Sequence, residues 1–151
     1  MIKIMIAPNR YIQGPRVLKE TGKYIAHLGS KVFFIGGPTA LSAVKDQISA
    51  SLEEHSMAYQ FETFSGECTR ASAARLSEKA RQFGADVVAG IGGGRALDTA
   101  KAVSHELGSA LVTIPTVASN DAPCSALVVQ HKEAVSYTHL RAHETPEHLV
   151  C

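Results

Sequence analysis

The stretch from Val88 to Lys101 reads VAGIGGGRALDTAK and contains the pattern that decides the fold. An apolar run typical of a buried strand leads directly into three glycines, and an amphipathic helical pattern follows them. Glycine lets a phosphate approach the backbone closely, and the N-terminus of the next helix favours an anion. We therefore expect an anion-binding turn at Gly92, Gly93 and Gly94, with Arg95 adding a charged contact.

The residues of this stretch leave a second interpretation open. GxGxxG fails because Arg95 or Leu97 stands where the third glycine belongs, and no Gly-Lys-Ser/Thr forms a Walker pattern. A tight turn with close packing of helix on strand is the alternative explanation of the glycines. Asp98 and Lys101, three residues apart on the predicted helix, are spaced like an ordinary surface ion pair.

Short apolar runs alternate with helical patterns on both sides of this stretch. Strands are expected at 2–7, 32–35, 59–64, 86–91 and 110–114, and helices at 16–28, 41–52, 70–83 and 96–107. This alternation predicts right-handed βαβ units and a parallel sheet covered on both faces. We expect a doubly wound α/β domain of the Rossmann-like, nucleotide-binding type over residues 1–134.

Composition narrows the class of protein. The chain has 151 residues, 45% hydrophobic and 19% charged, as in globular proteins, and its net charge of +1 gives no attraction to nucleic acid or anionic lipid. No apolar run approaches the roughly 20 residues that span a bilayer, and the N-terminus lacks a signal-peptide pattern. Three widely spaced cysteines without a CxxC pair indicate free thiols in a reducing cytoplasm. We expect a cytoplasmic protein with neither nucleic acid nor membrane as a partner.

A polar loop, IPTVASNDAPCSA, follows the last predicted strand from Ile114 to Ala126. It leaves the carboxyl end of a strand, where open α/β sheets bind their ligands. Its one carboxylate is Asp121. Ser119, Asn120 and Asp121 also suit an Asx-type turn, so the residues alone leave a binding loop and a structural loop equally open.

The segment from Val135 to Cys151 breaks the alternation. It contains His139, His143 and His148, which suggest a metal site at first sight. Pro146 interrupts any helix that would carry the third histidine, and no carboxylate stands in a ligand register. The string resembles a translated sequencing adapter, so we expect a non-native tail without regular structure rather than a site.

The two motifs together, GGG-x-x-x-D-x-x-K and PT-x-ASNDAPCSA, resemble the iron- or zinc-dependent alcohol dehydrogenases with a dehydroquinate-synthase-like nucleotide domain. The loop is similar to that of the glycerol branch. The resemblance implies NAD-dependent oxidation of glycerol, or a related small polyol, to the ketone, with zinc or iron binding the substrate hydroxyl. It also implies a homo-oligomer and an all-helical second domain beyond this chain, which carries the metal ligands, so we assign no metal ligand here.

Carried over residue by residue, the resemblance assigns cofactor-binding roles in both motifs. The residues are Gly92, Gly93, Gly94, Arg95, Asp98, Thr116, Ser119, Ser125 and Leu127. Asp121 matches the carboxylate that contacts the polyol and is the catalytic candidate. Two positions depart from the family: Gly37 stands where an Asp usually contacts the adenine ribose, which leaves NAD and NADP open, and His131 stands where a Tyr is usual.

Two other functions are compatible with this domain. A lyase related to dehydroquinate synthase would use the same nucleotide fold, although the loop around Asp121 matches the polyol branch instead. A non-catalytic nucleotide-binding module would need only the glycine-rich turn. A downstream helical domain with an Asp and two His would favour the dehydrogenase over both.

Overall fold

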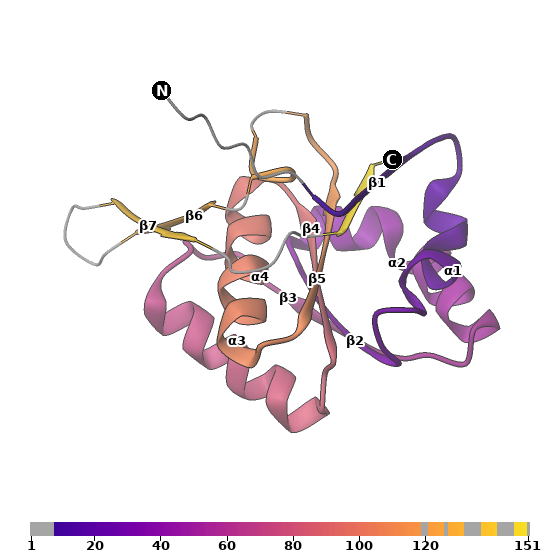
Figure 1. Ribbon diagram of the computed structural model, residues 1–151, viewed down its shortest axis with the longest axis horizontal. Helices are drawn as coiled ribbons and strands as arrows, with labels where there is room; N and C mark the ends of the chain where they lie inside the picture. Colours follow the sequence, from indigo (N-terminus) through magenta and orange to yellow (C-terminus); the bar gives the residue numbers. More distant parts are fainter. Residues whose placement is uncertain (1–7, 119–120, 126, 132–136, 142–146, 151) are drawn as a thin grey trace.

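The computed structural model describes residues 8–118, 121–125, 127–131, 137–141 and 147–150 (Figure 1). Its strands are β1 (Arg10–Gln13), β2 (Lys31–Gly36), β3 (Ala58–Thr63), β4 (Val87–Gly92), β5 (Ala110–Pro115), β6 (Leu127–His131), β7 (Tyr137–Arg141) and β8 (Glu147–Val150). Its helices are the short 3-10 helix η1 (Val17–Glu20), α1 (Thr21–Ile25), α2 (Pro38–Glu54), α3 (Arg70–Phe83) and α4 (Gly94–Leu107). The strand expected at 2–7 lies outside the described residues.

Six strands form one sheet in the order β1-β8-β5-β4-β2-β3, and every neighbouring pair in it is parallel. From β2 the chain crosses through α2 to the edge strand β3, returns through α3 to β4, and continues through α4 to β5. The direction of winding therefore reverses between β2 and β4. Open α/β sheets bind ligands at such a reversal, beyond the carboxyl ends of the strands. The predicted doubly wound α/β fold is confirmed.

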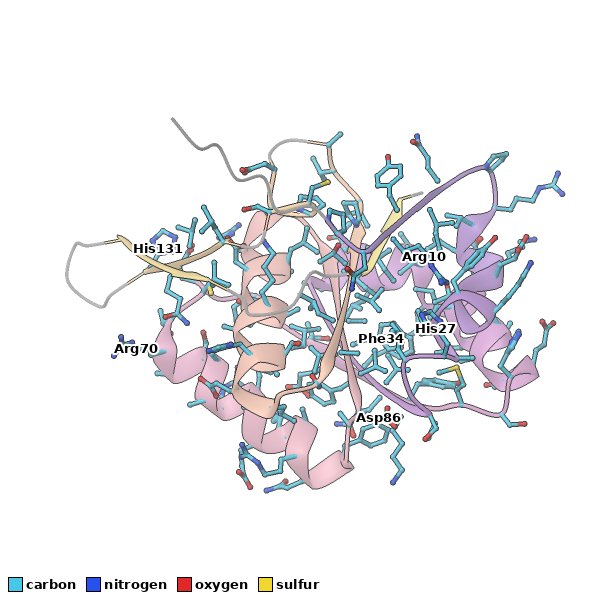
Figure 2. All side chains as sticks on the ribbon, in the orientation of Figure 1. Arg10, His27, Phe34, Arg70, Asp86 and His131 are labelled. Carbon is cyan, nitrogen blue, oxygen red and sulfur yellow. The ribbon has the colours of Figure 1, made fainter. Side chains whose placement is uncertain are left out.

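Helices cover both faces of the sheet, with α1 and α2 on one side and α3 and α4 on the other (Figure 1). The residues of β2 explain why, because alternate side chains enter opposite cores. Val32 and Phe34 pack toward α1 and α2, whereas Phe33 and Ile35 pack toward α3 and α4. Phe34 also stacks on Phe61 of β3, with ring centroids 4.7 Å apart (Figure 2). A strand buried on both faces needs this continuous apolar run.

The helix predicted at 16–28 is shorter and broken in two. Arg16 has a left-handed φ of 66°, and η1 and α1 follow it as separate turns. A Cβ atom at Gly22 would lie 2.4 Å from the carbonyl oxygen of Ser51 on α2, so α1 and α2 touch backbone to backbone. Contact with α2 determines where η1 and α1 lie. The hydrophobic pattern of residues 16–28 does not indicate this contact.

The expectation of a tail without regular structure is wrong in one respect. β7 pairs antiparallel with β6, and β8 lies between β1 and β5 in the parallel sheet. Backbone hydrogen bonds make these pairings, so they do not require the side-chain periodicity that the sequence lacks there. That residues 135–151 are non-native stays a prediction, and the side chains of the three tail histidines lie outside the described residues.

β4 and α4 pack against each other unusually closely at Gly90. A Cβ atom there would lie 2.7 Å from the Cβ of Ala100 and 3.2 Å from the Cα of Leu97. Both distances are shorter than ordinary van der Waals contact, and the second is to backbone. The strand and the helix can take this spacing only if residue 90 has no side chain. Close packing, the alternative interpretation of the glycine-rich stretch, therefore holds for Gly90.

We predict that Gly90→Ala destabilises the protein by about 1–3 kcal/mol, because the added methyl must push α4 away from β4. Gly14→Ala is the matched control, since no atom lies within 4 Å of a Cβ at that position. Urea unfolding of both variants measures the difference. Equal midpoints for Gly90→Ala and Gly14→Ala would show that β4 and α4 accommodate the added methyl without loss of stability.

Candidate functional site

A cavity of about 800 Å³ opens at the carboxyl ends of β2, β3, β4 and β5. The strand register makes these ends level, because Gly36 pairs with Ile91 and Gly92 with Pro115. The turn after each strand contributes to the wall, and the lining includes Gly37, Gly66, Gly93, Arg95 and Thr116. Its volume lies within the range of about 300–1,000 Å³ that is typical of small-molecule sites.

Two helices begin at the wall of this cavity without a side-chain cap among the described residues. The N-cap of α2 is Gly37 and that of α4 is Gly93. By contrast, α3 begins with a capping box in which Thr69 and Ser72 bond each other's backbone N–H groups. The first N–H groups of a helix lack intrahelical partners and carry partial positive charge. The cavity therefore suits a ligand with anionic groups.

Gly92 and Gly93, at the start of α4, have different roles in the turn. Gly92 has a φ of 131°, a conformation that L-residues rarely adopt. Gly93 has an extended backbone, and a Cβ atom there would meet no atom within 4 Å. The absence of a side chain at Gly93 thus leaves the cavity open, and packing does not require a glycine at this position. The predicted residues Gly92, Gly93, Gly94, Arg95 and Thr116 are brought together on this one wall.

Arg95 supplies a cation at the rim of the cavity. Its guanidinium donates a hydrogen bond of 2.9 Å to Glu67, whose second oxygen lies 3.6 Å from Nε2 of His131. The backbone N–H of His131 also donates to the carbonyl of Cys68, which ties β6 to the segment just before α3 (Figure 2). Glu67 therefore joins the start of α4 to the end of β6 beside the cavity.

Asp98 and Lys101 do form an ion pair, but it is buried rather than on the surface. Lys101 has no exposed area and Asp98 only 7%, and Nζ lies 3.1 Å from Oδ1. Lys101 also donates to the carbonyl of Leu127 at 2.9 Å, and Asp98 accepts from the N–H of Val129 at 3.4 Å. Burial raises the pKa of Asp98, and Lys101 opposes that rise. The pair faces β6 and lies outside the cavity lining.

The loop after β5 is closed by the backbone of Asp121. Its carbonyl accepts hydrogen bonds from the N–H groups of Cys124 and Ser125, at 3.0 and 2.8 Å. The Asx-type interpretation required the carboxylate to accept them. The side chain of Asp121 is exposed, and no hydrogen bond of its carboxylate is found within the described part of the chain. This side chain is therefore available to a ligand.

Two further predicted residues follow this turn. The hydroxyl of Ser125 accepts a 3.0 Å hydrogen bond from the N–H of Leu127, whose side chain is 42% exposed. Ser119 lies outside the described residues. Neither Ser125 nor Leu127 is among the residues that line the cavity, so the structure places them with Asp98 and Lys101 rather than with the glycines.

Sequence reasoning missed the contribution of α2. Gly36, Gly37 and Pro38 follow a buried strand and begin a helix, the same order as at Gly92 to Gly94. A second glycine-rich turn between a strand and a helix was the pattern that would have found it. Cys68 lies buried, and burial raises the pKa of its thiol to about 11, which disfavours the reactive thiolate at neutral pH.

The described residues contain no cluster of three or more His, Cys, Asp or Glu side chains that could hold a metal ion. The donor set of a catalytic zinc or iron is thus not found in this part of the chain. No helix that the structure describes is both long enough and apolar enough to cross a membrane.

Comparisons with known proteins agree with this architecture. The chain matches the family described as iron-containing alcohol dehydrogenase over residues 8–151. It is 37% identical over 134 residues to a glycerol dehydrogenase of Citrobacter freundii, and 35% identical over 146 residues to a glycolaldehyde reductase of Halobacterium salinarum. These matches cover 89% and 95% of this chain but only 37% and 40% of the relatives.

A solved structure of a probable glycerol dehydrogenase from Sinorhizobium meliloti 1021 superimposes with a TM-score of 0.86. It is 34% identical, and the match covers 99% of this chain and 40% of that one. The two motifs on which the resemblance depends, the glycine-rich turn at Gly92 to Gly94 and the loop around Asp121, lie within the matched residues. The chain belongs to the iron-containing alcohol dehydrogenase family.

Proposed function

We propose that this chain is the cofactor-binding portion of a dehydrogenase that oxidises glycerol, or a related small polyol, to the ketone with a nicotinamide dinucleotide. The observation that carries the proposal is the cavity on which two uncapped helix N-termini converge. A dinucleotide has anionic phosphates that suit such an arrangement. The named activities of the relatives, glycerol dehydrogenase and glycolaldehyde reductase, concern small hydroxylated substrates of the same chemistry.

The α4 side of the cavity would hold the pyrophosphate. Gly93 leaves the space that the phosphates need, the first N–H groups of α4 would donate to them, and Arg95 would add a charge-assisted contact. The bound cofactor would accept a hydride from the substrate carbon. We propose NAD as the cofactor because the family resemblance implies it. On the α2 side, Gly37 offers no carboxylate to a ribose hydroxyl, so NADP is the alternative.

Asp121 would contact the hydroxyls of the polyol. Support comes from its place beyond the carboxyl end of β5, and from a turn that its carbonyl closes while its carboxylate stays exposed. The family resemblance implies zinc or iron, but the described residues offer no ligand cluster. The chain spans 37% of the Citrobacter relative, so we propose that the metal ligands belong to the remainder of the enzyme.

The first test replaces Gly93 by valine in the full-length protein. A side chain there would enter the space proposed for the pyrophosphate, so affinity for NADH should fall about a hundredfold or more, equivalent to about 2.7 kcal/mol. Gly14→Val is the matched control, because both positions have no atom within 4 Å of a Cβ. Calorimetric titration with NADH and NADPH gives the affinities, and thermal unfolding checks the folds. Unchanged NADH affinity in a folded Gly93→Val protein would contradict the proposed cradle.

The second test replaces Asp121 by asparagine. Loss of its charge should lower kcat/KM for glycerol about tenfold, equivalent to about 1.4 kcal/mol of transition-state binding. The melting temperature and NADH affinity should stay the same, because the carbonyl of Asp121 and not its carboxylate closes the turn. Steady-state kinetics on 2-propanol, which lacks the flanking hydroxyls, provide the comparison. Parental rates on both alcohols would show that Asp121 does not contact the polyol.

A further inference from the structure

Lys101 is one of the largest fully buried side chains in the described part of the molecule, and the proposed chemistry does not use it. It lies on α4, one turn beyond the residues that line the cavity. Its ammonium donates to the carboxylate of Asp98 and to the carbonyl of Leu127. A charge taken entirely out of water costs free energy that a single ion pair does not reliably return. The position of Lys101 therefore calls for an explanation other than stability.

Hydrogen bonds lead from Lys101 to the loop of the proposed substrate site. Lys101 donates to the carbonyl of Leu127, and the N–H of Leu127 donates to the hydroxyl of Ser125 at 3.0 Å. The N–H of Ser125 in turn donates to the carbonyl of Asp121 at 2.8 Å. Three successive contacts thus connect the interior of α4 with the backbone of Asp121.

Asp98 and β5 hold the same segment at two more points. The second carboxylate oxygen of Asp98 accepts from the N–H of Val129. The ion pair therefore bonds the backbone of β6 at Leu127 and at Val129, on both sides of Val128. The buried hydroxyl of Thr113 donates to the carbonyl of Pro123 at 3.0 Å. Asp121 is therefore the exposed end of a loop whose return path is fixed to α4 and β5.

We propose that Lys101, paired with Asp98, is a positioning residue that fixes the loop from Asp121 to Ser125 at the carboxyl edge of the sheet. The Lys101 side chain reaches from α4 to the Leu127 carbonyl, and Asp98 pairs with it while accepting from the N–H of Val129. The placement of the loop stands on the contacts alone. Its consequence for substrate rests on the proposed function, in which Asp121 contacts the polyol.

Backbone amide exchange tests the placement without any cofactor. In Lys101→Met, the amides of Cys124, Ser125, Leu127 and Val129 should exchange at least tenfold faster, while those of β4 keep their protection. Ser104→Ala is the matched control, because Ser104 is also buried on α4 and bonds a backbone carbonyl, that of Ser109, away from the loop. Equal exchange at the four loop amides in both variants would overturn the proposal.

A double variant tests the same proposal if the single variant Lys101→Met does not fold. Lys101→Met alone leaves Asp98 buried without its partner, whereas Lys101→Met with Asp98→Leu removes both charges and still lacks the anchor. The double variant should fold and show the same fast exchange in the loop. A folded double variant with parental exchange at Leu127 and Val129 would also overturn the proposal.

Kinetics on the full-length enzyme separate this inference from the proposed function. Lys101→Met should raise KM for glycerol about tenfold and leave the affinity for NADH unchanged, since the pair lies outside the cavity lining. A parental KM with fast loop exchange would overturn the link to substrate. If the parent protein fails to bind NADH, the proposed function fails, and the exchange experiment still decides the role of Lys101.

Discussion

The close approach of α4 to β4 is the constraint on which the rest of this structure depends. Because residue 90 has no side chain, Ala100 and Leu97 come within a distance that any Cβ would prevent. The helix axis is thereby set close against the central strand of the sheet. The N-terminus of α4 then lies directly beyond the end of β4, where the winding reverses toward β2, and the ligand cavity forms at that point.

The charged groups along α4 differ in their exposure to solvent. At its first turn the charges are backbone N–H groups and the exposed Arg95, which remain available to a ligand. One turn later the charges of Asp98 and Lys101 are buried and satisfied by each other and by β6. Charged groups on the same helix are therefore exposed at Arg95 and buried at Asp98 and Lys101.

The carbonyl of Asp121 closes the turn from Asp121 to Ser125 without using the carboxylate of that residue. A turn closed by a carboxylate would use up the oxygen atoms that a polyol hydroxyl needs. Here the backbone accepts from Cys124 and Ser125, and the carboxylate stays exposed. The backbone of Asp121 thus closes the turn, while its side chain takes no part in that closure.

The sequence predicts the alternation of strands and helices, a helix over residues 70–83 and the glycine-rich turn, because hydrophobic periodicity and glycine spacing are local properties. Tertiary contacts set the break between η1 and α1, the place of β8 between β1 and β5, and the burial of Asp98 and Lys101. A spacing of three residues predicts an ion pair on a helix, but it cannot tell whether water or β6 covers that pair. Which element packs over a residue depends on the whole chain, and in this protein that packing separates an ordinary surface pair from a buried anchor.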